Sequence, residues 1–187
     1  MSPTRTAVRK SAKPAARSAA KKPAKPVAKA PKLGTLPEWN LTDLYPAIDS
    51  VEVKRDLDRA DADSIAFEES YKGKLAGLTA EGRLIEAVKR YEALDDLIGR
   101  LISYAGLVYA GNTTDPVRAK FYGDMQERIT KASLHLIFFT LELNRVDDAA
   151  LEQAMADPAL GHYRPWIEDI RKERPYQLDD KIEELFH

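Results

Sequence analysis

Residues 37–46 read Pro37-Glu38-Trp39-Asn40-Leu41-Thr42-Asp43-Leu44-Tyr45-Pro46 and stand at an abrupt change of composition. Before them lies a stretch of Lys, Arg, Ala, Pro and Ser, and after them come long periodic apolar patterns with acidic faces. Either Thr42 or Asp43 is expected to cap a single turn that ends at Pro46. The side chains expected to anchor this segment on a helical body are Trp39, Leu41, Leu44 and Tyr45. The segment therefore predicts where the folded part begins.

Three long apolar patterns follow, each with steps of three and four residues, which is typical of amphipathic helices. The first runs from Val53 to Leu78 and the second from Leu84 to Val108. We expect Thr79 to cap the second helix and Gly111-Asn112 to end it. The third begins at Asp115-Pro116, with Asp as cap and Pro in the first turn, and continues to Phe139.

Shorter helices are predicted at about 147–156, stopped by Asp157-Pro158, at about 160–173, and from Asp179 onward. No strand pattern of useful length is present. The prediction is an all-α fold, a bundle of three long antiparallel helices with two or three short ones, although a solenoid of helix pairs is an alternative. Because residues 134–143 are apolar nearly all the way round, we expect an exposed apolar surface there unless another segment covers it.

The charge is divided unevenly along the chain. Residues 1–32 hold ten Lys or Arg and no acid, so 19 basic residues remain against all 30 acids, which makes the two parts about +10 and −11. We expect residues 1–35 to be a disordered tail and residues 36–187 to form one helical domain. The tail is expected to be a solubilising extension. Weak, salt-dependent contact with nucleic acid is the alternative, without aromatic side chains to stack on bases.

Composition excludes several classes of protein. The chain has no cysteine, so disulfides and thiolate metal sites are ruled out. No apolar run is long enough to cross a membrane, and no apolar core of a secretory signal is present. A transit peptide is disfavoured because Pro14, Pro23, Pro26 and Pro31 would interrupt an amphipathic helix. We therefore predict a cytoplasmic location and no membrane partner.

No constellation of residues in this chain predicts catalysis. His135 lies in the most apolar part of the third pattern and is interpreted as a core or boundary histidine. His162 is expected to pack with Tyr163 and Trp166, although a surface contact to a substrate is the alternative, and His187 is uninformative. The adjacent acids are interpreted as solvated faces and caps, because neighbours on a helix point about 100° apart. These pairs are Asp95-Asp96, Asp147-Asp148, Asp179-Asp180 and Glu183-Glu184. We predict no catalytic, cofactor-binding or metal-binding residue.

Five short motifs in order carry a resemblance to a known family. Besides residues 37–46, these are Tyr71-Lys72-Gly73-Lys74-Leu75, Leu101-Ile102-Ser103-Tyr104-Ala105 with Asn112-Thr113-Thr114-Asp115-Pro116, Phe138-Phe139-Thr140-Leu141-Glu142-Leu143-Asn144, and Asp157-Pro158-Ala159-Leu160 through Arg174-Pro175-Tyr176-Gln177-Leu178. Together they resemble the N-terminal region of the oligoendopeptidase F branch of the thimet-oligopeptidase-like zinc metallopeptidases. The resemblance covers about residues 36–187.

The resemblance implies an enzyme that hydrolyses short peptides with a zinc ion held by a His-Glu-x-x-His motif and a later Glu. None of the three histidines is followed by Glu, and no two lie four residues apart, so no family catalytic residue transfers to this chain. The expectation is an N-terminal lobe that walls the substrate cleft, cut before the catalytic region, which would be its main partner. We expect this lobe alone to bind no zinc and to have no activity. The alternatives are a free-standing helical interaction module and a degenerate remnant of the peptidase.

Overall fold

The computed structural model describes Gly34 and residues 38–186, and these residues form helices and loops without a strand. The all-α prediction is confirmed. The predicted tail lies outside the described residues except for Gly34. The elements are α1 (Val51–Tyr71), α2 (Leu75–Ala80), α3 (Leu84–Gly111), α4 (Pro116–Leu134), α5 (Ile137–Arg145), α6 (Asp148–Ala154), α7 (Pro158–Gly161), α8 (Arg164–Arg171), the 3₁₀ turn η1 (Arg174–Tyr176) and α9 (Asp180–Phe186).

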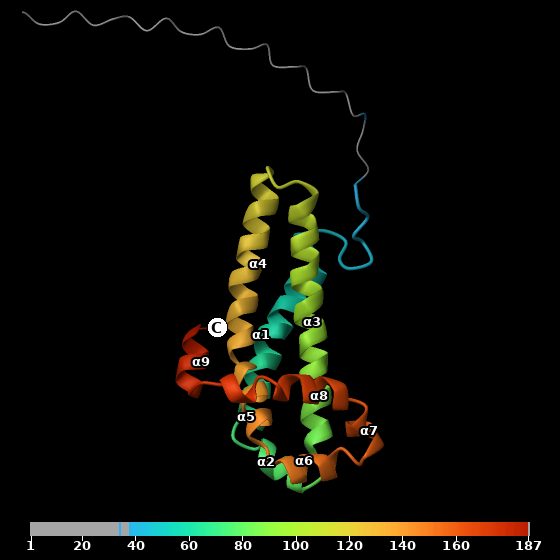
Figure 1. The fold of residues 1–187 in the computed structure, drawn as a ribbon. Helices are drawn as coiled ribbons and strands as arrows, with labels where there is room; N and C mark the ends of the chain where they lie inside the picture. Colours follow the sequence, from blue (N-terminus) through green and yellow to red (C-terminus); the bar gives the residue numbers. More distant parts are fainter. Residues whose placement is uncertain (1–33, 35–37, 187) are drawn as a thin grey trace, which may run out of the picture. The chain divides into compact units, whose positions relative to one another are not determined.

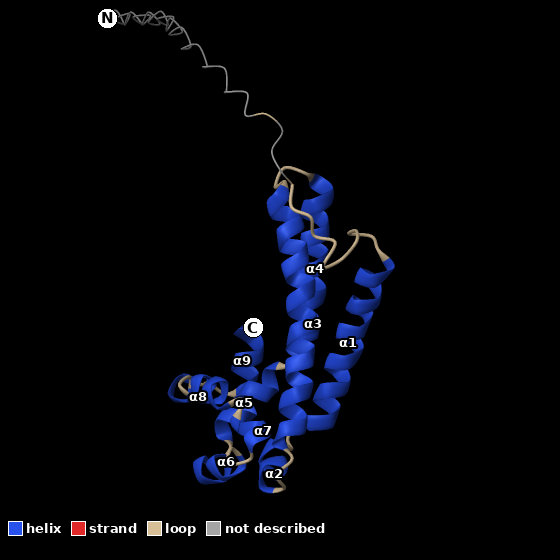
Figure 2. Cartoon of the chain, turned by 90° about the vertical axis from the view of Figure 1, so that its right-hand side faces the viewer, coloured by secondary structure: helices blue, strands red, loops and turns tan. Residues whose placement is uncertain are grey.

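The three long helices α1, α3 and α4 pack against one another, and α3 runs antiparallel to the other two (Figure 1). Their shared face buries small and medium apolar side chains such as Val53, Ala60, Leu101 and Ala105. Helices α5 to α8 gather around α2 and the start of α3 (Figure 2). The chain therefore consists of a three-helix bundle with a layer of short helices around one end.

Side-chain caps fix several helix starts. The Ser50 hydroxyl accepts a hydrogen bond from Val53 N at 3.3 Å, and Asp115 Oδ1 accepts from Val117 N at 2.8 Å with Pro116 in the first turn. The predicted cap and Pro at the start of α4 are thus confirmed, as is the end of α3 at Gly111. Thr79 does not cap α3. It lies buried in α2, where its hydroxyl donates to Leu75 O instead.

Two predicted long helices are broken, which yields more short helices than the two or three expected. The first pattern divides at Gly73, whose φ of 77° lies in the left-handed region. A helix cannot pass through that conformation, and glycine adopts it without strain. The third pattern divides at His135 and Leu136, where the chain turns from α4 into α5. In the same way residues 160–173 form α7 and α8 instead of one helix.

The expected exposure of residues 134–143 is wrong apart from Leu134, which is 43 % exposed. The turn between α4 and α5 brings this stretch into contact with α1, α3 and α8. There Phe139 stacks on Tyr91 with ring centroids 4.6 Å apart and meets Phe67 edge-on at 5.3 Å. This aromatic core buries the side chains that a single straight helix would have left without a partner.

The N-terminal anchor is confirmed in part. Tyr45 is buried and its hydroxyl donates to Asp56 Oδ2 at 3.0 Å. Leu41 and Leu44 pack against the core, whereas Trp39 is 67 % exposed and anchors nothing in the described part of the chain. The turn is capped by neither Thr42 nor Asp43. Instead Asn40 Oδ1 accepts from Thr42 N at 3.1 Å.

Candidate functional site

A cavity lies where α3, α4, α5 and α9 meet, and we call it the α9 cavity. Its volume is about 470 Å³. Apolar side chains make up half of its wall, and polar or acidic ones the rest. The lining residues are Tyr91, Asp95, Ile98, Ser133, Leu136, Ile137, Thr140, Leu141, Glu183 and Phe186. A cavity with apolar walls and a few polar groups is the usual form of a binding site.

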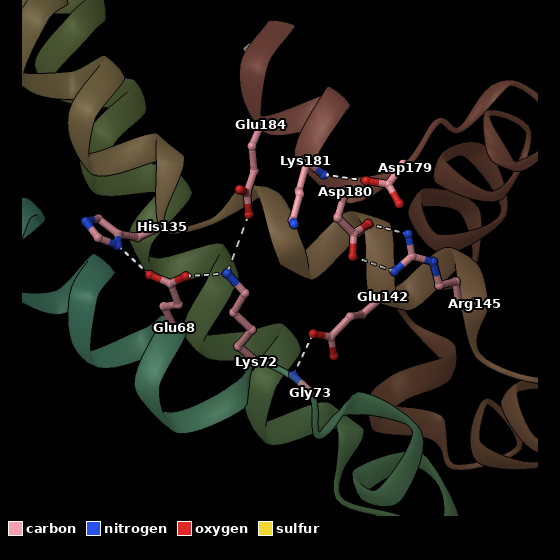
Figure 3. A network of polar contacts seen from close by, with 10 residues as sticks. All are labelled: Glu68, Lys72, Gly73, His135, Glu142, Arg145, Asp179, Asp180, Lys181 and Glu184. Carbon is pink, nitrogen blue, oxygen red and sulfur yellow. Dashed lines mark hydrogen bonds and ion pairs between the residues drawn. The ribbon is translucent and has the colours of Figure 1, made fainter.

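Charged side chains hold α9 at the edge of this cavity (Figure 3). Asp180 accepts two hydrogen bonds from the Arg145 guanidinium, one of them at 2.8 Å. Glu184 lies 3.6 Å from Lys72 Nζ, so the second contact ties α9 to the end of α1. Within α9 the Asp179 carboxylate accepts from Lys181 N at 3.1 Å and caps the helix.

The same network continues to the junction of α4 and α5. Glu68 accepts from Lys72 Nζ at 2.7 Å and pairs with His135 Nδ1 at 2.5 Å. Glu142 Oε1 accepts from Gly73 N at 2.6 Å and thereby joins α5 to the turn after α1. The network therefore spans α1, α4, α5 and α9, and it crosses both breaks in the predicted long helices.

The pKa values of these groups shift in the directions that ion pairing dictates. The hydrogen bonds from Arg145 hold the pKa of Asp180 below its usual value. Partial burial would raise the pKa of Glu68, but the hydrogen bonds from His135 and Lys72 outweigh it and lower the pKa. The hydrogen bond to Glu68 raises the pKa of Lys72. At neutral pH all three groups are charged.

Helix α9 is docked by its polar face. The side chains directed at the body are acidic, while no residue of α9 is buried. Of the ten large apolar side chains exposed in the described part of the chain, five lie in the last segment, and we call them the C-terminal apolar patch. They are Tyr176, Leu178, Ile182, Leu185 and Phe186. Such a cluster on one segment indicates a surface that contacts something else.

Two predicted histidine environments can be checked. His135 is half-buried and paired with Glu68, which confirms a boundary histidine, although its partner is 67 residues away in sequence. His162 packs edge-on against Tyr163 with centroids 5.3 Å apart, as expected. It lines a second cavity of about 400 Å³ together with Trp166 and the acids Glu92, Asp95 and Asp96. His187 lies outside the described residues.

The adjacent acids are caps and surface groups as predicted, but several also make ion pairs between helices. Asp147 caps α6 by accepting from Ala150 N at 3.0 Å. Asp148 accepts from Arg171 and from Arg174, the latter at 3.0 Å. Arg171 in turn donates to Leu143 O and Val146 O at the end of α5. Sequence spacing gave no sign of these pairs, because the partners lie more than 20 residues apart.

Nothing in residues 38–186 gathers three or more His, Asp or Glu side chains as a metal site would require. The zinc ion that the resemblance implies therefore has no fitting ligand set in this part of the chain, and no step of a reaction is assigned to these residues. Among the helices described, none is long and apolar enough to cross a membrane.

Comparison with known proteins agrees with the resemblance. The family model described as Oligopeptidase F matches residues 142–187. Oligopeptidase PepF of Bacillus subtilis (strain 168) is 28 % identical over 152 residues, which is 79 % of this chain and 21 % of that protein. The chain thus spans about a fifth of the length of this relative. No solved structure matches.

These matches support an oligoendopeptidase F-like N-terminal region, in agreement with the resemblance seen in the sequence. The matched residues 142–187 include the last turn of α5 and all of α9, so they carry both Arg145 and the C-terminal apolar patch. The comparisons give no support to the alternative of a nucleic-acid contact by residues 1–32, which lie outside the described part of the chain.

Proposed function

We propose that residues 36–187 are the N-terminal helical lobe of an oligoendopeptidase F-like zinc peptidase and wall the cleft in which that enzyme hydrolyses short peptides. The catalytic region, which this chain does not contain, would supply the zinc ion, the water that it activates and the general base. The lobe would restrict access to short unstructured peptides. The cytoplasmic location stays a prediction.

The observation that carries this proposal is the C-terminal apolar patch. The core of the body is closed, with Phe67, Leu101 and Phe139 fully buried, whereas Leu185 and Phe186 are 81 % and 77 % exposed. The relative is about five times as long as the matched segment, so a large further region is available to cover the patch. We therefore assign the rest of the peptidase as the partner of this surface.

A chimera tests the proposal. The N-terminal fifth of Bacillus subtilis Oligopeptidase PepF is replaced by residues 36–187, and hydrolysis of a quenched fluorescent peptide of about ten residues is measured. We expect zinc-dependent hydrolysis within about tenfold of the parent. The double variant Leu185→Glu, Phe186→Glu should lower kcat/KM by at least about tenfold, because it places two charges in an apolar contact.

The matched control is Val117→Glu, which charges an exposed apolar side chain on α4 away from the patch. It should leave kcat/KM unchanged. Circular dichroism and zinc content establish that each chimera is folded and loaded. A folded, zinc-loaded chimera that hydrolyses nothing would contradict the proposed function, and full activity of the double variant would contradict the role of the patch.

A further inference from the structure

Helix α9 is a short amphipathic helix that is docked through its charged face, whereas such helices usually pack through their apolar face. At 100° per residue, Asp180 and Glu184 lie about 40° apart on one face. Ile182, Leu185 and Phe186 lie about 140° to 240° from Asp180, on the opposite face. The charged face meets Arg145 and Lys72, whereas Leu185 and Phe186 on the apolar face are 81 % and 77 % exposed.

The contacts that keep α9 in this orientation are weak. The Arg145–Asp180 and Lys72–Glu184 pairs are about half exposed, with side-chain exposures of 46–48 %. An exposed pair of this kind shifts an equilibrium by no more than about fivefold. A seven-residue helix is also too short to be stable without packing. No residue of α9 is buried, and these two ion pairs are the polar contacts that tie α9 to α5 and to the end of α1.

A surface that suits the opposite face lies directly beside α9. The α9 cavity presents Ile98, Leu136, Ile137 and Leu141, and Phe186 already stands at its rim. Glu183 and Phe186 are the α9 residues that line the cavity now, so rotating α9 by about a quarter turn would direct Ile182 and Leu185 toward these side chains and remove them from water. The segment has a fixed base for such a movement, because Gln177 Nε2 donates to Leu141 O at 3.2 Å.

We propose that α9 is a two-position strap, held polar side inward by the Arg145–Asp180 and Lys72–Glu184 pairs and turning its apolar face onto the α9 cavity when these pairs are screened or removed. In the first position the C-terminal apolar patch is available to a partner. In the second position the chain itself covers the members of the patch that lie on α9, Ile182, Leu185 and Phe186. Ionic strength would thus determine whether the apolar side chains of α9 are exposed. This movement of α9 does not depend on whether the chain serves a peptidase.

The chain has no cysteine, so Leu185→Cys in the full chain gives a unique attachment point for the polarity-sensitive dye acrylodan. We expect emission typical of water at low salt. Raising NaCl to 1 M shortens the Debye length to about 3 Å. It should shift the emission to shorter wavelength, while hydrogen exchange shows that the α9 amides stay protected. The variant Arg145→Gln should raise the buried population about two- to fivefold at low salt.

Three further variants decide the interpretation. The swap Arg145→Asp with Asp180→Arg restores the pair and should restore the low-salt emission. Arg164→Gln removes a comparable two-point ion pair with Glu152 on another helix and should have no effect. Ile137→Glu in the Arg145→Gln background charges the cavity wall and should abolish the shift. Unchanged emission in both high salt and Arg145→Gln would overturn the proposal. So would loss of amide protection in α9, because the helix would then unfold instead of rotating.

Discussion

At the scale of single residues, the decisive side chains are those whose partners lie far away in the sequence. Tyr45 was expected to be an anchor because of its type and its place before Pro46, and it is buried. Its hydrogen bond to Asp56, and the approach of Arg100 to within 3.8 Å of that carboxylate, could not be inferred from spacing. Burial and the bond to Asp56 together raise the pKa of Tyr45 to about 12.

The Asp56 carboxylate gives a pH-dependent prediction. Burial would raise its pKa, but hydrogen bonds from Arg55 and Tyr45 outweigh burial and hold the pKa below its usual value. A lowered pKa means that the charged form stabilises the fold above about pH 4 and that this contribution is lost as the pH falls through the folded-state pKa. Tyr45→Phe should therefore lower the free energy of unfolding by about 1.5–3 kcal/mol at pH 7 and by less at pH 3.

Urea unfolding at both pH values measures this difference. Tyr109→Phe is the control, since Tyr109 stacks on Tyr122 at 5.2 Å and its hydroxyl has no hydrogen-bond partner in the described residues. It should change the free energy of unfolding by no more than about 0.5 kcal/mol. An equal loss at pH 7 and pH 3 for Tyr45→Phe would show that the charge of Asp56 is not involved.

At the scale of elements, the sequence predicted helix type and approximate position but not the breaks. The apolar period from Val53 to Leu78 continues in phase through Gly73, so periodicity alone indicates one helix. Gly73 itself was the available signal for a break, since glycine favours the left-handed conformation. The break at His135 and Leu136 gave no such signal, because both residues are compatible with a helix. Tertiary packing of the aromatic core and the His135–Glu68 pair accompany that turn.

Two glycines near this break should respond in opposite directions. Gly73→Ala places a Cβ at φ 77° and should lower the free energy of unfolding by about 1 kcal/mol. Gly77 lies inside α2 with nothing within 4 Å of a Cβ, so Gly77→Ala should raise the free energy of unfolding by up to about 1 kcal/mol. Thermal and urea unfolding of both variants provide the measurement. If the two changes had the same sign, backbone conformation would not explain the break.

At the scale of the whole domain, sequence reasoning predicted an apolar surface but placed it on the wrong segment. Residues 134–143 are so apolar that they seemed to need an absent partner, yet the short helices that follow supply one. The stretch from Asp179 onward was predicted as an ordinary amphipathic start of a helix, and nothing in its pattern indicated that the acids would face the body. The candidate site therefore emerges only once Arg145 and Lys72 are placed beside α9.

This arrangement predicts that the surface apolar side chains and the core contribute very differently to stability. Replacing Leu185 and Phe186 together by Lys should leave the free energy of unfolding within about 0.5 kcal/mol of the original, because neither side chain is packed. The same change should reduce the fluorescence of a bound hydrophobic dye such as ANS, since it removes two of the three most exposed members of the patch.

Phe139→Ala supplies the contrast. Its side chain is fully buried between Tyr91 and Phe67, so the free energy of unfolding should fall by about 3–5 kcal/mol. Dye fluorescence and urea unfolding of the three proteins under one low-salt condition measure both effects. A large loss of stability on changing Leu185 and Phe186 would mean that α9 already packs its apolar face inward at low salt. In that case the ion pairs of Arg145 and Lys72 would not determine the orientation of α9.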